Sequence, residues 1–216
     1  QEGDLISVPT RIFRGFENVG TDYGMIMAIL GGDDAGGGVV WAPQVLENAL
    51  THGLVLSEKG VLYDTKKGQS LPVGEQPMPP LTPKQLADIV ELPVESLIPQ
   101  YVARYWDMVA LAKHTPCQVI GETGLIKDKP GFLVELLVRT SISNQAYQSA
   151  KDEVLMVMRG HWKLTWGHDQ LVLNPGDTCW VPAHLSHSLE VCVSGEASLY
   201  RVTGTDDDAG LTWQGE

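Results

Sequence analysis

The strongest constraint on the fold is a run of short strand-like segments between residues 117 and 204. Most are rich in Val, Leu, Ile, Thr or aromatic residues, and Gly, Pro, Asn or Asp residues separate one from the next. Short strands at this spacing, without a long helix between them, are typical of antiparallel β-sandwiches and barrels. The predicted strands are CQVIG, GFLVELLVRT, EVLMVMRG, HWKLTWG, QLVLNPGD, TCWVPA, SHSLEVCV and ASLYRVTG.

A repeat relates the two ends of the chain. Residues 3–37 align without a gap on residues 176–210, at an offset of 173 residues. The nine identities are grouped at turn residues, which favours a true duplication over a coincidence of composition. They are Gly3/Gly176, Asp4/Asp177, Val8/Val181, Pro9/Pro182, Glu17/Glu190, Gly31/Gly204, Asp33/Asp206, Asp34/Asp207 and Gly37/Gly210.

The repeat predicts one complete barrel and part of another. Residues 117–175 precede the C-terminal copy, and their counterparts would lie before residue 1. Strands expected near Leu5 and Met25 would leave apolar edges unpaired, and such edges recruit a partner. We therefore expect a complementing chain, a domain-swapped neighbour in a homo-oligomer, or an N-terminal half-barrel.

Four regions are predicted along the chain. Residues 1–40 are expected to form the C-terminal half of a first barrel, and residues 117–205 a complete second barrel. Residues 41–116 are a helical and Pro-rich connection, and residues 206–216 are an acidic tail. The predicted architecture is therefore mainly β, duplicated, with an incomplete first barrel.

Helix signals and a Pro-rich stretch alternate in the connection. Pro at a first turn and Gly at an end predict a helix between Pro43 and Gly53. A capping-box pattern at Thr82 predicts a helix through Val90. A further helix is predicted over residues 100–113, with short turns bounded by Pro93 and Pro99, and the Pro-rich stretch 65–81 is predicted to be a linker or surface strap.

Composition excludes several classes of partner. The net charge is -12 and the pI about 4.8, with no basic cluster, so we expect no nucleic-acid partner and no anionic membrane surface. No apolar run approaches the ~20 residues that a membrane-spanning helix needs. Three cysteines without CxxC spacing indicate neither a disulfide scaffold nor a Cys-rich zinc module. A reducing, cytoplasmic location is expected.

Two spaced motifs lie in the predicted C-terminal barrel. Six residues separate a Glu from a Gly in the first. The second runs Gly, five residues, Pro, and then a His five positions after the Pro. The matching residues are Glu153 and Gly160, followed by Gly176, Pro182 and His187, with His184 two positions after the Pro and Val191 four positions after His187.

These motifs resemble those of the cupin superfamily, a double-stranded β-helix or jelly-roll barrel. In the family pattern a Gly stands at the place of His184 and an Asn at the place of Val191. The N-terminal copy also resembles the second motif, with Arg14 where the metal-binding His stands. The resemblance implies a bicupin with degenerate metal motifs.

The resemblance implies a metal site that this sequence matches only in part. Metal-binding cupins hold Fe, Mn, Ni, Cu or Zn with three His and one Glu, whose imidazole and carboxylate groups suit these ions. Here the His-x-His positions fall on Ala146 and Gln148. The candidate ligands are Gln148, Glu153 and His187, and His184 lies close in sequence. The preferred interpretation is a metal-free barrel in which Glu153 and His187 form a hydrogen-bonded pair.

Two functions remain open. One is an enzyme of small-molecule metabolism, a metal-dependent dioxygenase-, isomerase- or lyase-like bicupin with one divalent transition metal and a degenerate C-terminal barrel. The alternative is a non-catalytic, metal-free cupin that acts as a small-molecule-binding or structural module. Arg14 is a candidate for binding a substrate carboxylate, because a guanidinium offers a fork of donors to a planar anion. A surface salt bridge is the competing interpretation of Arg14.

Overall fold

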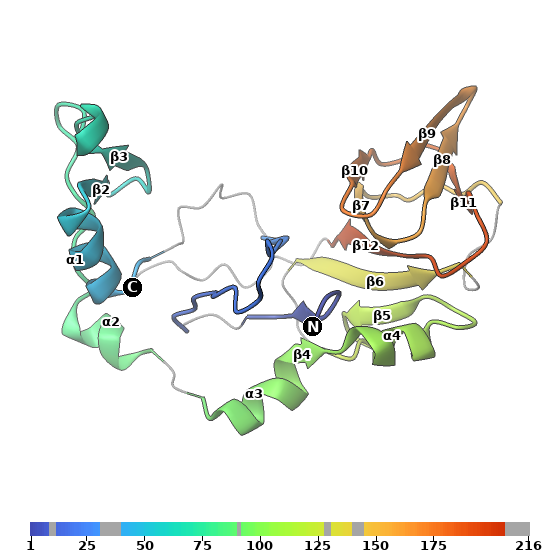
Figure 1. Ribbon diagram of the computed structural model, residues 1–216, viewed down its shortest axis with the longest axis horizontal. Coiled ribbons are helices and arrows are strands. Elements are labelled where there is room, and N and C mark those ends of the chain that lie inside the picture. The colour runs from blue at the N-terminus through green and yellow to red at the C-terminus, as the bar shows by residue number, and fades with distance from the viewer. Residues whose placement is uncertain (9–11, 31–39, 90–91, 128–130, 140–144, 206–216) are drawn as a thin grey trace. The chain divides into compact units, whose positions relative to one another are not determined.

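The computed structural model describes residues 1–8, 12–30, 40–89, 92–127, 131–139 and 145–205 (Figure 1). The chain divides into two compact units. One contains residues 1–7, residues 29–30 and the described residues from Pro93 on. The other contains the described residues within 8–28 and within 40–92. The predicted acidic tail 206–216 and the repeat matches within residues 31–37 lie outside the described residues.

All eight strands predicted from the sequence are formed. Seven lie within two residues of the expected bounds, and the eighth, predicted over QLVLNPGD, ends at Leu173, four residues early. The stretches between them contain the turn residues that the sequence places there, several of them glycines with positive φ. The strands are β5 (Cys117–Ile120), β6 (Phe132–Val138), β7 (Glu153–Arg159), β8 (Trp162–Trp166), β9 (Asp169–Leu173), β10 (Thr178–Val181), β11 (Ser188–Val191) and β12 (Ser198–Gly204).

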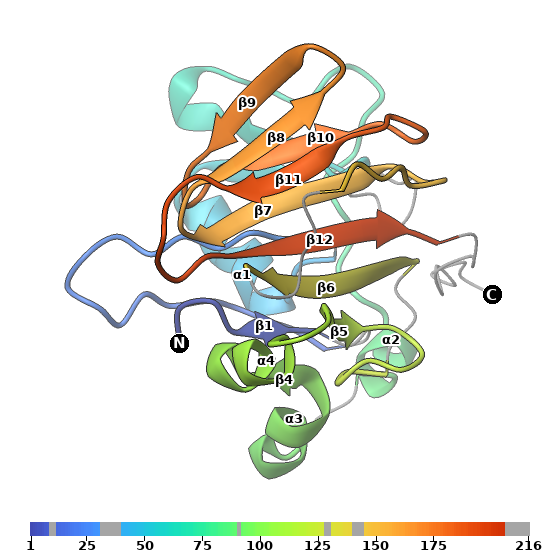
Figure 2. The same ribbon diagram turned by 90° about the vertical axis from the view of Figure 1, so that its right-hand side faces the viewer.

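The strands form two antiparallel sheets. One has the order β10-β7-β12-β6-β5, and the other has the order β11-β8-β9. Figure 2 shows β12 between β6 and β7, with the smaller sheet beside them. From β7 to β12 the chain passes repeatedly from one sheet to the other, which is the connection pattern of a jelly roll. The described C-terminal region is therefore mainly β, as expected.

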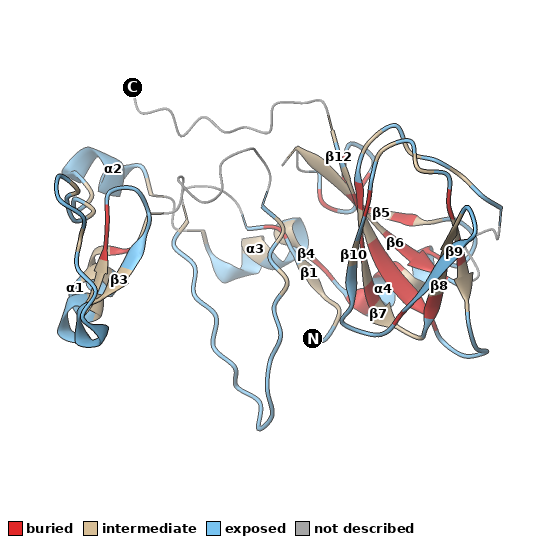
Figure 3. Ribbon diagram, turned by 90° about the horizontal axis from the view of Figure 1, so that it is seen from above, coloured by how far each residue is buried: buried red, intermediate tan, exposed pale blue. Residues whose placement is uncertain are grey.

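The five-stranded sheet carries an apolar core on each face, and Figure 3 marks the buried residues in its strands. Side chains alternate between the two faces of a strand. Leu155 and Leu199 point to the inner face and pack with Trp162 of the smaller sheet. The opposite face packs against a short helix that contributes Tyr105 and Met108, both buried.

The predicted helix over residues 100–113 is interrupted. A two-residue strand separates two helices, and Pro99, predicted to bound a turn, lies inside the first of them. Pro93 stands at that helix's N-terminus, as a boundary residue should. The elements of this part are β1 (Leu5–Ile6), α3 (Val94–Tyr101), β4 (Val102–Ala103) and α4 (Tyr105–Leu111).

Contacts with the N-terminal residues account for the interruption. β4 pairs antiparallel with β1, which takes the backbone out of the helix. The carboxylate of Asp4 accepts a hydrogen bond of 2.9 Å from the backbone N–H of Tyr105, at the start of α4. Asp4 also forms an ion pair with Arg104, at 2.6 Å. Because these partners are remote in sequence, local helix propensity does not reveal the break.

The second unit consists of two helices and a hairpin. The capping box predicted at Thr82 is formed with Gln85, although its helix is shorter than predicted. The Pro-rich stretch runs as a strap whose Met78 N–H donates to the carbonyl of Leu56 at 2.8 Å. The elements are α1 (Pro43–Thr51), β2 (Leu54–Leu56), β3 (Leu62–Asp64), the 3-10 turn Thr65–Lys67 and α2 (Pro83–Ala87).

Residues 12–30 contain neither helix nor strand, so the strand expected near Met25 is not formed. The strand expected near Leu5 is formed as β1. The assignment of residues 1–40 to half of a first barrel stays a prediction. Within the described part of the chain, no helix is both long and apolar enough to span a membrane.

Candidate functional site

A group of polar side chains interrupts the apolar interior at one end of the barrel. Glu135 of β6 lies directly opposite Arg201 of β12, and cross-strand partners project to the same face. Glu153 begins β7, and Thr203 is its partner on β12. Glu153 is therefore diagonal to Arg201 on the inner face.

Arg201 joins two carboxylates. Its Nε and Nη2 atoms donate to Oε2 of Glu135 at 3.0 and 2.6 Å, and its Nε lies 3.7 Å from Oε1 of Glu153. The guanidinium also stands 5.6 Å from the ring centroid of Tyr147. The Glu135 and Arg201 side chains remain 24% and 19% exposed, so solvent reaches this edge of the cluster.

Backbone and ring contacts hold His187 in one orientation. A pair of 2.8 Å backbone hydrogen bonds joins His187 to Tyr147, and their rings lie 4.3 Å apart. The Nδ1 atom lies 2.9 Å from the carbonyl oxygen of Leu185. Because a carbonyl only accepts, Nδ1 carries a proton, and in the corresponding tautomer of the uncharged ring Nε2 is the acceptor. That atom faces Oε2 of Glu153 at 3.5 Å.

Three buried atoms of this cluster have no hydrogen-bond partner in the described structure: Oη of Tyr147, Oε2 of Glu153 and Nε2 of His187. The Glu153 and His187 side chains are 3% and 0% exposed. Buried polar atoms are normally paired, and leaving one unpaired costs about 1–3 kcal/mol. Three such atoms at one place are therefore a feature that requires an explanation.

Burial changes the protonation of the cluster. It raises the pKa of Glu153, an effect that Arg201 and His187 offset only in part. It also raises the pKa of the Tyr147 phenol. A protonated Glu153 could donate its proton to Nε2 of His187, but 3.5 Å is too long for a formed O–H···N bond. The pair predicted from the sequence is thus adjacent without being hydrogen-bonded.

The structure brings together only two of the four candidate metal ligands, Glu153 and His187. Gln148 is exposed, because side chains alternate along this segment and Tyr147 takes the inward direction. His184 is exposed as well. It has a positive φ of 63°, the backbone conformation that the Gly of the motif adopts readily. His184 therefore occupies the motif's turn and contributes no side chain to the cluster.

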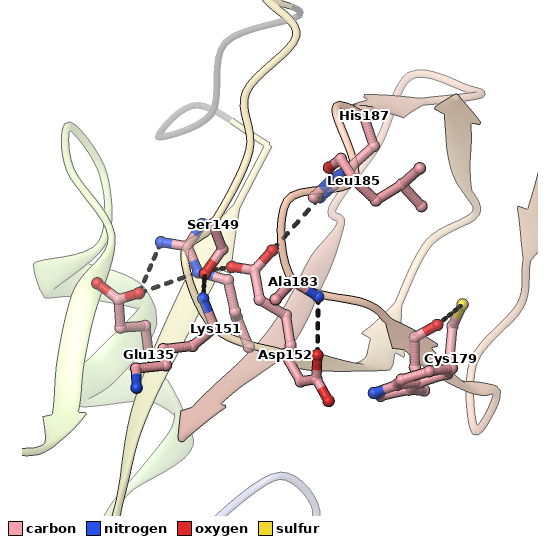
Figure 4. A network of polar contacts seen from close by, with 11 residues as sticks. Glu135, Ser149, Lys151, Asp152, Cys179, Ala183, Leu185 and His187 are labelled. Atoms are coloured by element: carbon pink, nitrogen blue, oxygen red, sulfur yellow. Dashed lines mark hydrogen bonds and ion pairs between the residues drawn. The ribbon is translucent and has the colours of Figure 1, made fainter. Parts of the chain in front are cut away.

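The loop that carries His184 and His187 is attached to the segment before β7. The carboxylate of Asp152 accepts a 2.7 Å hydrogen bond from the N–H of Ala183 (Figure 4). The N–H of His184 donates to the carbonyl of Ser149, also at 2.7 Å. These contacts place His187 beside Tyr147 and Glu153.

Two residues of the cluster, Arg201 and Tyr147, are not among the site residues predicted from the sequence. Arg201 carries a signal in the sequence, because it has the same parity as the inward Leu199 and is the one charged residue in SLYRVTG. Tyr147 stands between the two positions assigned to His-x-His, and only the structure shows which residues of this segment turn inward. Arg14 is exposed, in a stretch without helix or strand.

The donor set does not fit the metal centre that the family resemblance implies. No group of three or more His, Cys, Asp or Glu side chains converges anywhere in the described ranges. Glu153 and His187 supply only two donors of the types that the resemblance implies. A centre of three imidazoles and a carboxylate therefore cannot be assembled from the described residues.

Comparison with known proteins gives similar structures only. No family model and no curated protein matches the chain. A cupin-2 domain-containing protein from Shewanella frigidimarina is 17% identical, with a TM-score of 0.38 over 47% of this chain and 93% of that one. A cupin superfamily protein from Desulfitobacterium hafniense is 18% identical, with a TM-score of 0.32 over 38% and 73%.

Hydroxypropylphosphonic acid epoxidase from S. wedmorenis is also among the similar structures. It is 23% identical, with a TM-score of 0.30 over 34% of this chain and 44% of that one. The matched part of the chain thus spans less than half of the epoxidase.

Proposed function

We propose that the chain is a cupin-type protein whose C-terminal barrel binds a small polar molecule at Tyr147, Glu153 and His187. Backbone geometry at the motif positions supports the cupin assignment. Gly160 and Gly176 have φ values of 73° and 89° in the turns that precede β8 and β10. A Cβ atom at Gly160 would lie 2.6 Å from Cβ of Ala197, so this turn requires glycine.

The observation that carries the binding role is the set of three unpaired buried atoms. The lone pair on Nε2 of His187 and Oε2 of an ionised Glu153 accept hydrogen bonds, and the Tyr147 hydroxyl can donate one. A molecule with two neighbouring hydroxyls complements this set, since each hydroxyl donates its proton to one of the two acceptors and a hydroxyl oxygen accepts from the phenol. Arg201 is already engaged by two carboxylates, which disfavours a ligand carboxylate at that point.

Ligand-induced stabilisation tests this proposal. Polyols and sugars are screened for a rise in the Tm of the purified chain, and hits are measured by calorimetry. Binding should be lost in Glu153→Gln and in His187→Asn. It should be retained in Glu190→Gln, which makes the same chemical change at a partly exposed ion pair with Lys163. A screen without hits, or hits that bind all variants equally, would count against the proposal.

The metal-dependent dioxygenase, isomerase or lyase is the second candidate. Its supporting observation is the 3.5 Å separation between Oε2 of Glu153 and Nε2 of His187, because two ligands of one tetrahedrally coordinated ion, each about 2.0–2.2 Å from it, stand about that far apart. These two donors alone do not complete a centre, so the remaining ligands would have to come from solvent or substrate. Elemental analysis separates the two candidates. Stoichiometric Fe, Mn, Ni, Cu or Zn that is lost in His187→Asn would favour the second candidate, and its absence from the protein would favour the first.

A further inference from the structure

The turn at the N-terminus has the geometry of the turn before β10. In each turn the third residue is a glycine with positive φ, 84° in Gly3 and 89° in Gly176. In each the Asp that follows donates its N–H to the carbonyl three residues back, at 3.1 and 2.9 Å. The Asp carboxylate also accepts a hydrogen bond from the main-chain nitrogen of the first residue of the turn, at 2.9 Å from Gln1 and at 2.7 Å from Asn174. A strand follows both turns.

The repeat also preserves the positions that fill the barrel interior. Three inward residues of the C-terminal copy are 0–2% exposed and belong to the inner core. Their counterparts at the offset of 173 are all large and apolar, yet 36–63% exposed. Two of these pairs are not identities, so they are independent of the matches that define the repeat. The pairs are Val8/Val181, Phe16/Leu189 and Ile26/Leu199.

More apolar side chains are exposed in the same stretch. Within residues 12–30, Val19, Tyr23, Met25 and Leu30 are each more than 60% exposed. Single exposed apolar residues are common, but so many large ones within one short stretch are unusual. The residues that correspond to interior positions of the C-terminal barrel are thus exposed in this stretch. To be buried as their counterparts are, they need further strands packed over them.

We infer that residues 3–8 and 12–30 belong to the closing strands of a second jelly-roll barrel, and that a strand segment N-terminal to Gln1 in the same polypeptide covers them. The register of the repeat selects this source, because the counterparts of β5–β9 precede residue 3 in the same order. A second copy of this chain offers no equivalent place. Its own Val181, Leu189 and Leu199 already fill the barrel interior.

The inference places Arg14 inside that barrel. Arg14 is the counterpart of His187, whose side chain is 0% exposed and points inward beside Glu153. A guanidinium cannot ligate a metal, whereas it binds planar anions through paired donors. The second barrel would therefore present a cation where the C-terminal barrel presents an imidazole.

Intact mass and N-terminal sequencing of the protein purified from its natural source test the inference. The native polypeptide should begin well before Gln1, by a segment comparable in length to residues 117–175. Amide exchange within residues 12–30 should be slower in the native protein than in the chain of residues 1–216, by about tenfold or more. A native protein that begins at Gln1, or one in which these amides exchange equally fast, would overturn the inference.

Substitutions in the native protein provide a second measurement. Phe16→Ser and Ile26→Ser should accelerate exchange across residues 12–30 in the native protein and leave exchange in the chain of residues 1–216 unchanged. Val73→Ser is the matched control, because Val73 is fully exposed and has no counterpart in the repeat. If Phe16→Ser and Ile26→Ser behave like Val73→Ser in the native protein, the two side chains are not covered there and the inference is wrong.

Discussion

The interior of the C-terminal barrel has an apolar middle and a polar end, and the two are equally buried. Leu155 and Glu153 lie two residues apart on the inner face of β7, with 0% and 3% exposure. Leu155 packs with Leu199 and Trp162, whereas Glu153 faces His187 without a hydrogen bond. Burial by itself therefore does not distinguish a residue that stabilises the fold from one that is available to a ligand. What distinguishes them is whether the buried polar atoms already have hydrogen-bond partners.

Removing an apolar side chain from the middle of the barrel should have the largest effect. Leu155→Ala leaves a cavity between the two sheets and should lower the free energy of unfolding by about 2–5 kcal/mol. Denaturant titration measures it. Leu171→Ala on β9 is the control, because Leu171 is 44% exposed, and it should cost less than about 1 kcal/mol. Equal losses in both variants would mean that the interior is not packed as described.

At the polar end, stability should depend on pH through Glu153. Its raised pKa means that, above the ordinary Glu range, the folded state holds a proton that the unfolded state has released. Folding then takes up a proton, so the stabilisation by this group falls as the pH rises through that window. Glu153→Gln should remove this dependence, and its stability relative to wild type should increase as the pH rises above the ordinary Glu range. The free energy of unfolding of both proteins is measured at a series of pH values. A difference between them that does not change with pH would contradict the prediction.

The turn before His187 contains one residue with a strained backbone. His184 has a φ of 63°, a conformation that costs a non-glycine residue about 1–2 kcal/mol. His184→Gly should raise the free energy of unfolding by about 0.5–1 kcal/mol, because glycine's greater freedom in the unfolded chain cancels part of the relief. His168→Gly, at a position without positive φ, should not stabilise the protein. Thermal unfolding of both variants measures the difference.

The smallest effect is expected at Tyr147. Its hydroxyl has no hydrogen-bond partner, so Tyr147→Phe should change stability by less than about 0.5 kcal/mol while weakening ligand binding. This combination would separate a binding role from a packing role. A loss of stability above about 1 kcal/mol would show that the hydroxyl is already satisfied in the free protein.

The elements of the barrel could be predicted from the sequence, whereas the membership of the candidate site could be predicted only in part. Strand alternation identifies the inward residues of β7 and β12, and motif spacing identifies Glu153 and His187. The sequence alone cannot decide whether Tyr147 or Gln148 points inward. Their segment is not a regular strand, so which of its side chains face the interior depends on its pairing with His187. The interruption at Val102–Ala103 is hidden for the same reason, since β1 supplies the pairing partner.

By itself, the sequence determined the eight barrel strands, the capping box at Thr82 and the motif turns at Gly160 and Gly176, because each depends on residues adjacent in the chain. Only the tertiary structure decided that Arg201 joins Glu135 and Glu153, and that Tyr147 rather than Gln148 lies beside His187. Local propensities and periodicity act over a few residues. Pairing across strands that are far apart in sequence determines which inward side chains meet.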